Sequence, residues 1–161
     1  MKIISRLLLA FTSVFTLDIL TKAWAEQALS FQRPVSVIGD LLRFTLGYNT
    51  GVAFGLFAKG GSGPLILTGI VIIGLAIWAI SALRAGDFTP AAAWPVGLIL
   101  GGAVGNFGDR LLDLRVTDFL DVGIGTTRWP TFNLADTFII VGAVILMLTT
   151  LSAKPGLETK A

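Results

Sequence analysis

Four long apolar segments limit what this chain can fold into. They cover about residues 4–24, 64–83, 91–107 and 132–151, and each is close to the roughly 20 residues that a helix needs to cross a bilayer. Hydrophobic residues make up 54% of the chain and charged residues only 14%, a balance outside the range of most soluble domains. We therefore expect an all-α membrane protein with four transmembrane helices, forming one integral membrane domain over residues 1–161.

The two long connections between these segments, residues 25–63 and 108–131, carry the patterns of short strands. Apolar residues alternate with polar or small ones over residues 42–48, after an apolar run and a Gly-Asp turn. Alternation continues over residues 114–124, where Asp118 is the only polar member of an otherwise apolar row. The sequence thus predicts a small β-structured element in these loops.

Basic residues predict the orientation of the helices. They are densest near the chain ends and in the short connection at residues 84–90, namely Lys2, Arg6, Arg84, Lys154 and Lys160. Because cytoplasmic loops are rich in Lys and Arg close to the spans, we expect both termini in the cytoplasm and both long connections on the outer side. Most of the unusual polar residues then fall on that outer side: Asp18, Lys22, Asn49, Asn106, Asp109, Arg110 and Asp136.

The first apolar segment also has features of a cleavable signal peptide. Lys2 and Arg6 precede it, and small residues surround Trp24 as they would at a cleavage site. Asp18 and Lys22 weigh against cleavage, because an acid four residues before a base is a spacing that stabilises a helix. We expect a retained helix, in which this pair either serves as an ion pair or takes part in a functional site.

Asp118 and Asp136 are the strongest candidates for chemistry. Ionisable groups next to hydrocarbon are costly, so an acid in such a place indicates a functional site. The chain has no His and no Cys, which removes the commonest general base, thiol nucleophiles and thiolate metal sites. Catalysis would depend on carboxylates, hydroxyls, Lys or Tyr. A net charge of +2 is too small to indicate nucleic-acid binding.

Other motifs have structural explanations beside the functional ones. Glycine recurs at every fourth position over residues 97–105, which favours close helix packing over phosphate binding. For Asp109 we expect an ion pair with Arg110 or a neighbouring loop in preference to catalysis. Asn133 and Asp136 are spaced i,i+3, so Asn133 could cap the last helix while Asp136 benefits from its positive end.

Successive motifs along nearly the whole chain resemble those of the bacterial lipoprotein signal peptidases, the signal peptidase II family. Asp18 and Lys22 match the family's first-helix positions, whereas Gly108 stands where the family more often has a larger apolar residue. The motifs are NTGVAFG (49–55), GGAVGNFGDR (101–110), VTDF (116–119) and FNLAD (132–136).

The resemblance implies an aspartic endopeptidase of the bacterial inner membrane that acts on diacylglyceryl-modified prolipoproteins. It would remove the signal peptide by cutting before the lipidated cysteine, with Asp118 and Asp136 as the catalytic pair. We expect no cofactor, no metal and no nucleic acid, and a monomer whose partners are the lipidated prolipoprotein and membrane lipid. The resemblance also assigns supporting or substrate-binding roles to Asn49, Asn106, Arg110 and Asn133, and structural polar roles to Asp18, Lys22 and Asp109.

Two other functions are compatible with acids in a membrane protein. A small proton- or ion-coupled transporter would use them as relays or cation ligands, and a noncatalytic assembly factor would use the polar cluster to bind a partner. The transporter is less favoured, because the chain shows no internal inverted repeat and its acids gather at one surface rather than at the midplane.

Overall fold

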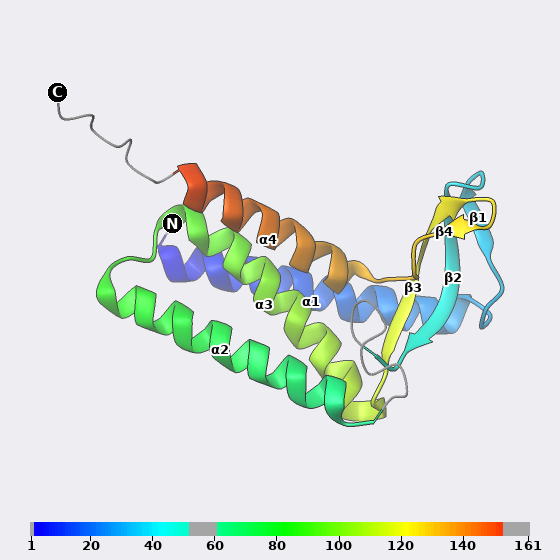
Figure 1. The fold of residues 1–161 in the computed structure, drawn as a ribbon, viewed down its shortest axis with the longest axis horizontal. Helices are drawn as coiled ribbons and strands as arrows, with labels where there is room; N and C mark the ends of the chain where they lie inside the picture. Colours follow the sequence, from blue (N-terminus) through cyan, green and yellow to red (C-terminus); the bar gives the residue numbers. More distant parts are fainter. Residues whose placement is uncertain (1, 52–60, 153–161) are drawn as a thin grey trace.

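A bundle of four helices with a small antiparallel sheet at one end forms the molecule (Figure 1). The computed structural model describes residues 2–51 and 61–152. All four helices are long and apolar enough to cross a membrane, which confirms the predicted fold class. In chain order the elements are α1 (Ile3–Ala28), β1 (Val35–Ile38), β2 (Leu42–Asn49), α2 (Gly63–Ala85), α3 (Pro90–Asp113), β3 (Val116–Ile124), β4 (Thr127–Arg128) and α4 (Leu134–Ser152).

Several predicted helix ends were wrong. α1 continues to Ala28 instead of ending near residue 24, and α3 continues to Asp113 instead of ending near residue 107. Polar residues end the apolar pattern there. In α3 the helix continues through Asp109 and Arg110, which have partners inside the protein, whereas the last three residues of α1 are exposed. At α4 the error is the reverse: the helix begins at Leu134, after an Asn133 side chain that accepts a hydrogen bond from the helix.

Glycines let α3 pack closely against its neighbours. A side chain at Gly101 would place its Cβ 2.7 Å from the backbone oxygen of Phe11 on α1. On the other side, a Cβ at Gly102 would lie 2.6 Å from the backbone oxygen of Ala135 on α4. Both distances are too short for a real contact, so only glycine permits these helix separations. The predicted packing role of the glycine series is confirmed.

The outward surface of the bundle is apolar. Along α2 a stripe of large side chains is exposed at helical spacing: Ile66, Ile70, Ile73 and Ile77. An exposed stripe of this kind would be unfavourable in water but suits the hydrocarbon of a bilayer. The exposed apolar residues therefore agree with four membrane-spanning helices.

The sheet has the order β1-β2-β3-β4 with antiparallel pairing throughout. Aromatic contacts attach it to α1, because the ring of Trp24 lies 5.0 Å from that of Phe44 and 6.0 Å from that of Phe119, centre to centre. Only two residues separate the end of α3 from the start of β3. β3 pairs with β2, and this pairing holds Asp118 opposite Gly47. This arrangement brings the start of β3 to the end of the helix bundle.

Candidate functional site

A buried polar cluster lies where the sheet meets the ends of α1, α3 and α4. Its members come from parts of the chain that are far apart in sequence but adjacent in this fold (Figure 1). Burial of so many polar groups would be costly without partners, and their hydrogen bonds show how the cost is offset. The buried members are Asp18, Lys22, Asn106, Arg110, Thr117, Asp118 and Asn133.

Asp118 occupies the third position of β3 and is only 1% exposed. Its Oδ1 accepts a hydrogen bond of 2.7 Å from Nδ2 of Asn133. Burial raises the pKa of the Asp118 carboxyl to about 7, and the nearby charge of Asp136 adds to that rise, while Asn133 and Asn49 oppose it as hydrogen-bond donors. Near neutral pH this acid can therefore hold or release a proton.

Asp136 lies in the first turn of α4, with its carboxylate facing α3. Oδ1 of Asp136 accepts a hydrogen bond of 2.7 Å from Nδ2 of Asn106. The backbone N–H of Asp136 donates to Oδ1 of Asn133 at 2.9 Å, so Asn133 caps the helix as an N-cap asparagine does. The cap and the partially positive end of α4 offset part of the cost of a carboxylate at this half-buried position.

Two amides connect the two acids. Nδ2 of Asn133 lies 3.1 Å from Oδ1 of Asn106, so the hydrogen bonds run from Asp118 through Asn133 and Asn106 to Asp136. The four side chains come from β3, the α4 cap, α3 and α4. This network joins the two acids that the sequence singled out.

A second group of charges adjoins this network on the α1 side. Nζ of Lys22 lies 2.6 Å from Oδ2 of Asp18, 2.9 Å from Oδ2 of Asp109 and 2.9 Å from Oδ1 of Asn106. Oδ1 of Asp18 also accepts from the backbone N–H of Ala135 at 3.1 Å. Asp18 and Lys22 thus hold α1 to both α3 and the first turn of α4.

The ion-pair partner that we expected first for Asp109 was wrong. Asp109 pairs with Lys22, and its Oδ2 also accepts from the backbone N–H of Thr117 in the adjoining strand. Residues at i and i+1 point in different directions on a helix, so Arg110 faces elsewhere. The second expectation, a bond to a neighbouring connection, agrees with the contact to Thr117.

Arg110 and Asn49 hold the backbone of Gly51, two residues beyond the end of β2. A guanidinium nitrogen of Arg110 donates to the backbone oxygen of Gly51 at 2.7 Å, and Oδ1 of Asn49 accepts from the N–H of Gly51 at 2.9 Å. The remaining residues of the motif at 49–55 lie outside the described part of the chain. In the described part, Arg110 and Asn49 fix the backbone of Gly51 beside the cluster.

Thr117 and Glu26 also belong to the cluster, although the sequence did not predict them as site residues. The Thr117 hydroxyl donates to Oε1 of Glu26 at 2.7 Å, and the Thr117 carbonyl accepts from Asn133 at 3.3 Å. The available signal was the polar residue next to Asp118 in the motif at 116–119. We considered only the alternate residues of that strand, yet both faces are buried at its start.

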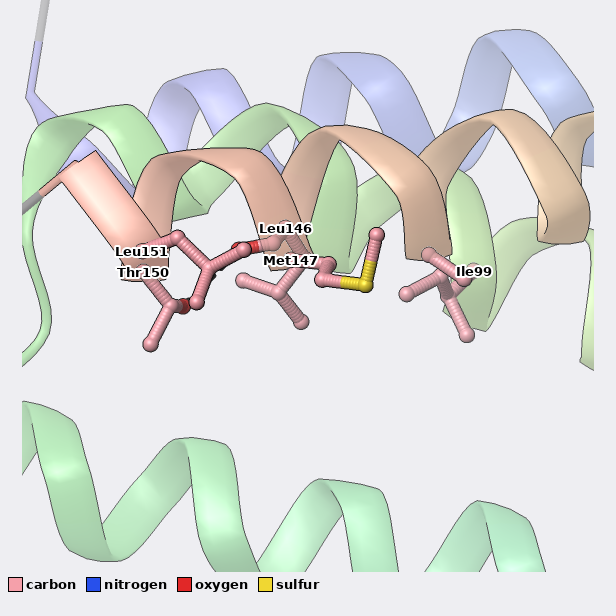
Figure 2. Close-up of a pocket in the computed structure, with 6 residues that line it drawn as sticks. Ile99, Leu146, Met147, Thr150 and Leu151 are labelled. Carbon is pink, nitrogen blue, oxygen red and sulfur yellow. Dashed lines mark hydrogen bonds between the residues drawn. The ribbon is translucent and has the colours of Figure 1, made fainter.

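A separate apolar groove lies far from this cluster, on the face of α3 and α4 that turns toward α2 (Figure 2). Its volume is about 350 Å³, and its lining residues are Ile99, Ala143, Leu146, Met147, Thr150 and Leu151. Leu146 lies roughly 15 Å along α4 from Asp136 at 1.5 Å per residue. The groove therefore contains none of the candidate catalytic residues. Across residues 2–51 and 61–152, acidic side chains form no cluster of three or more that could hold a metal ion.

Four spanning helices and a buried network with two acids at one end define a small integral membrane protein with a carboxylate site. Residues 10–152 match the model of a family described as Signal peptidase (SPase) II. The chain belongs to the signal peptidase II family of membrane proteases. This assignment confirms the predicted enzyme class over the transporter, and it indicates a multi-pass protein of the bacterial inner membrane.

Similar proteins cover most of the chain. A lipoprotein signal peptidase from Aquifex aeolicus (strain VF5) is 44% identical over 149 residues, which are 91% of this chain and 86% of that protein. One from Hydrogenovibrio crunogenus (strain DSM 25203 / XCL-2) is 37% identical over 152 residues, covering 92% and 86%. A solved structure described as a bacterial membrane enzyme superposes with a TM-score of 0.81 at 26% identity, covering 98% of this chain and 94% of that one.

Proposed function

We propose that this protein is an aspartic endopeptidase that removes the signal peptide of diacylglyceryl-modified prolipoproteins. It cuts on the N-terminal side of the lipidated cysteine, with Asp118 and Asp136 as the catalytic pair. The names of the similar proteins support the substrate class. The observation that carries the mechanism is the network of amides that joins the buried Asp118 to the half-buried Asp136.

The two acids have environments suited to different tasks. Asp136 accepts a hydrogen bond from Asn106 and lies at a helix N-terminus, so it serves as the ionised base that takes a proton from water. Asp118, with a pKa of about 7, serves as the acid that donates to the oxygen of the scissile carbonyl. Water attacks the carbonyl carbon, and a proton then passes to the leaving amine as the C–N bond breaks.

The surrounding residues support this pair. Asn106 and Asn133 hold the two carboxyl groups through their side-chain amides. Arg110 and Asn49 position the backbone at Gly51, where a substrate strand could be held from the sheet side. Asp18, Lys22 and Asp109 keep α1, α3 and the following strand together around the site.

The membrane gives the substrate a fixed position. The described start of α1 and end of α4 lie at the end of the bundle away from the sheet (Figure 1), and the density of basic residues near that end supports a cytoplasmic location for it. The acids then face the outer, periplasmic side. Acyl chains on the substrate would confine it to the bilayer and present its cleavage site at a constant depth. A monomer with a single domain and surrounding lipid is sufficient for this reaction.

Single replacements Asp118→Asn and Asp136→Asn test the mechanism. Each variant should lose cleavage of a lipidated prolipoprotein by at least about 100-fold, because one proton-transfer group is lost. Cleavage by purified protein is measured by the mobility shift of the substrate, and thermal unfolding shows that each variant is folded. Asp121→Asn is the matched control on the same strand and should keep most of the activity. Near-normal cleavage by either of the first two variants would refute the pair.

The same assay with an unlipidated prolipoprotein tests the substrate class. We expect cleavage to be much slower without the acyl chains, because the substrate loses its fixed depth in the bilayer. Equal rates on both substrates would refute the lipid requirement and leave the protease mechanism intact.

A further inference from the structure

The environment of Lys22 suggests a role beyond holding helices together. An ammonium group has three N–H donors, and three oxygens lie within 2.9 Å of Nζ, those of Asp18, Asp109 and Asn106. The Lys22 side chain is only 5% exposed. The two carboxylates account for two of the three donors, and the third donor goes to the amide oxygen of Asn106. The third contact, to an amide, connects Lys22 directly to the network around the two catalytic acids.

This third contact fixes which way the amide of Asn106 points. Both Lys22 Nζ, at 2.9 Å, and Asn133 Nδ2, at 3.1 Å, donate to Oδ1 of Asn106. Neither donor can face the NH2 group of Asn106, so that group must point toward Asp136, where it donates at 2.7 Å. With the amide reversed, an oxygen would face Oδ1 of Asp136, and the contact would require a protonated carboxyl. The Lys22 contact thus favours the ionised form of Asp136.

We propose that Lys22 is a positioning residue for catalysis. From α1, it orients the amide of Asn106 and favours the charge state that the Asp118–Asp136 pair needs. This inference rests on the proposed function, since it concerns the same two acids. The positive charge of Lys22 acts on Asp136 across one intervening amide, that of Asn106. In this buried setting charge interactions are stronger than in water.

Other charges near the pair act with Lys22 or against it. From α1 these are Asp18 and, through Thr117, Glu26. From α3 they are Asp109 and Arg110, and Arg110 lies near enough to interact with both catalytic acids. Lys22 and Arg110 favour ionised carboxyl groups in the pair, whereas Asp18, Asp109 and Glu26 oppose ionisation. Removal of a cation and removal of an anion should therefore shift the pH profile in opposite directions.

Lys22→Met provides the first test, because Met has a similar length and no charge. The profile of kcat/KM against pH, measured from pH 5 to 9 on a lipidated prolipoprotein, should move toward alkaline pH by about one unit. Without the cation, Asp136 ionises only at higher pH and Asp118 keeps its proton to higher pH. The loss of kcat/KM should therefore be several-fold greater at pH 5.5 than at pH 8.

Asp109→Asn provides the opposite test and remains informative if Lys22→Met fails to fold. Removal of an anion beside Lys22 should move the same profile toward acidic pH, by about half a unit. Arg128→Met is the control for general destabilisation. It removes an ion pair with Asp121 in the sheet, where Nε of Arg128 lies 2.5 Å from Oδ1 of Asp121, and should leave the pH profile unchanged.

Opposite shifts for the Lys22 and Asp109 variants would support the proposal. A uniform fall in kcat/KM with an unshifted profile, or shifts of the same sign, would overturn it and leave Lys22 with a structural role only. Failure of the proposed function would differ from this result, because Asp118→Asn or Asp136→Asn would then retain cleavage in the same assay.

Discussion

At the scale of single residues, Asp118 is a group whose burial opposes stability. Its pKa is raised to about 7 by burial first and by the charge of Asp136 second. Between its unfolded pKa of about 4 and pH 7, the folded protein binds a proton that the unfolded chain does not. The free energy of unfolding therefore decreases as pH rises through this window, and the full cost is present above pH 7.

Asp118→Asn should remove that cost. We expect the free energy of unfolding at pH 8 to rise by about 1–3 kcal/mol relative to the unmodified protein, with a smaller gain at pH 4. The asparagine keeps an oxygen that can accept from Asn133 but carries no charge to bury. Thermal unfolding in detergent micelles at both pH values measures the difference.

Asp121→Asn, on the same strand, should change the free energy of unfolding in the opposite direction. Burial alone would raise the pKa of Asp121, but hydrogen bonds from Arg128 and Thr45 outweigh it and hold that pKa below its usual range. The Asp121 carboxylate thus stabilises the fold above about pH 4 and loses this effect as pH falls. We expect Asp121→Asn to destabilise at pH 8. A gain in stability from Asp121→Asn, or a loss from Asp118→Asn, would contradict these assignments.

At the scale of elements, α3 is the helix on which the site depends, since it packs against each of the other helices. Gly101→Ala should destabilise the protein by about 1–3 kcal/mol, because the new methyl group would lie 2.7 Å from the backbone oxygen of Phe11. Any relief of this contact must move α1, which carries Lys22 and Asp18. Thermal unfolding measures the loss of stability, and the cleavage assay measures the effect of moving α1 on activity.

Gly108→Ala is the matched control on the same helix. A Cβ at Gly108 meets no atom within 4 Å in the part of the chain that the structure describes, and alanine favours a helix by up to about 1 kcal/mol over glycine. We expect this variant to be as stable as the unmodified protein or slightly more stable. Equal destabilisation by both alanines would show that close packing is not the reason for Gly101.

At the scale of the whole molecule, the described parts of both long connections lie at one end of the helix bundle (Figure 1). The natural chain has no cysteine, so single cysteines can report the orientation of that end in the membrane. Thr126→Cys, in the exposed turn between β3 and β4, should react with a membrane-impermeant maleimide in cells whose outer membrane has been permeabilised. Asp87→Cys, exposed between α2 and α3, should react only after the inner membrane is opened. The reverse pattern would place Asp118 and Asp136 on the cytoplasmic side.

The sequence alone determined the class of fold, because hydropathy and strand alternation are local properties that survive without knowledge of the neighbours. It predicted four spans, strands in both long connections and the glycine face of α3, and its motifs pointed to the two acids. It was wrong about the end of α3, because Asp109 and Arg110 leave the apolar pattern but remain helical with partners inside the protein.

Only the tertiary structure decided which polar groups meet. The bond from Ala135 to Asp18 joins residues 117 positions apart, and Lys22 finds Asp109 and Asn106 on another helix. No spacing rule predicts such partners, since each depends on how closely the glycines of α3 let the helices approach. The acids were recognisable in the sequence, but only helix packing connects them in one hydrogen-bonded network that Lys22 contacts through Asn106.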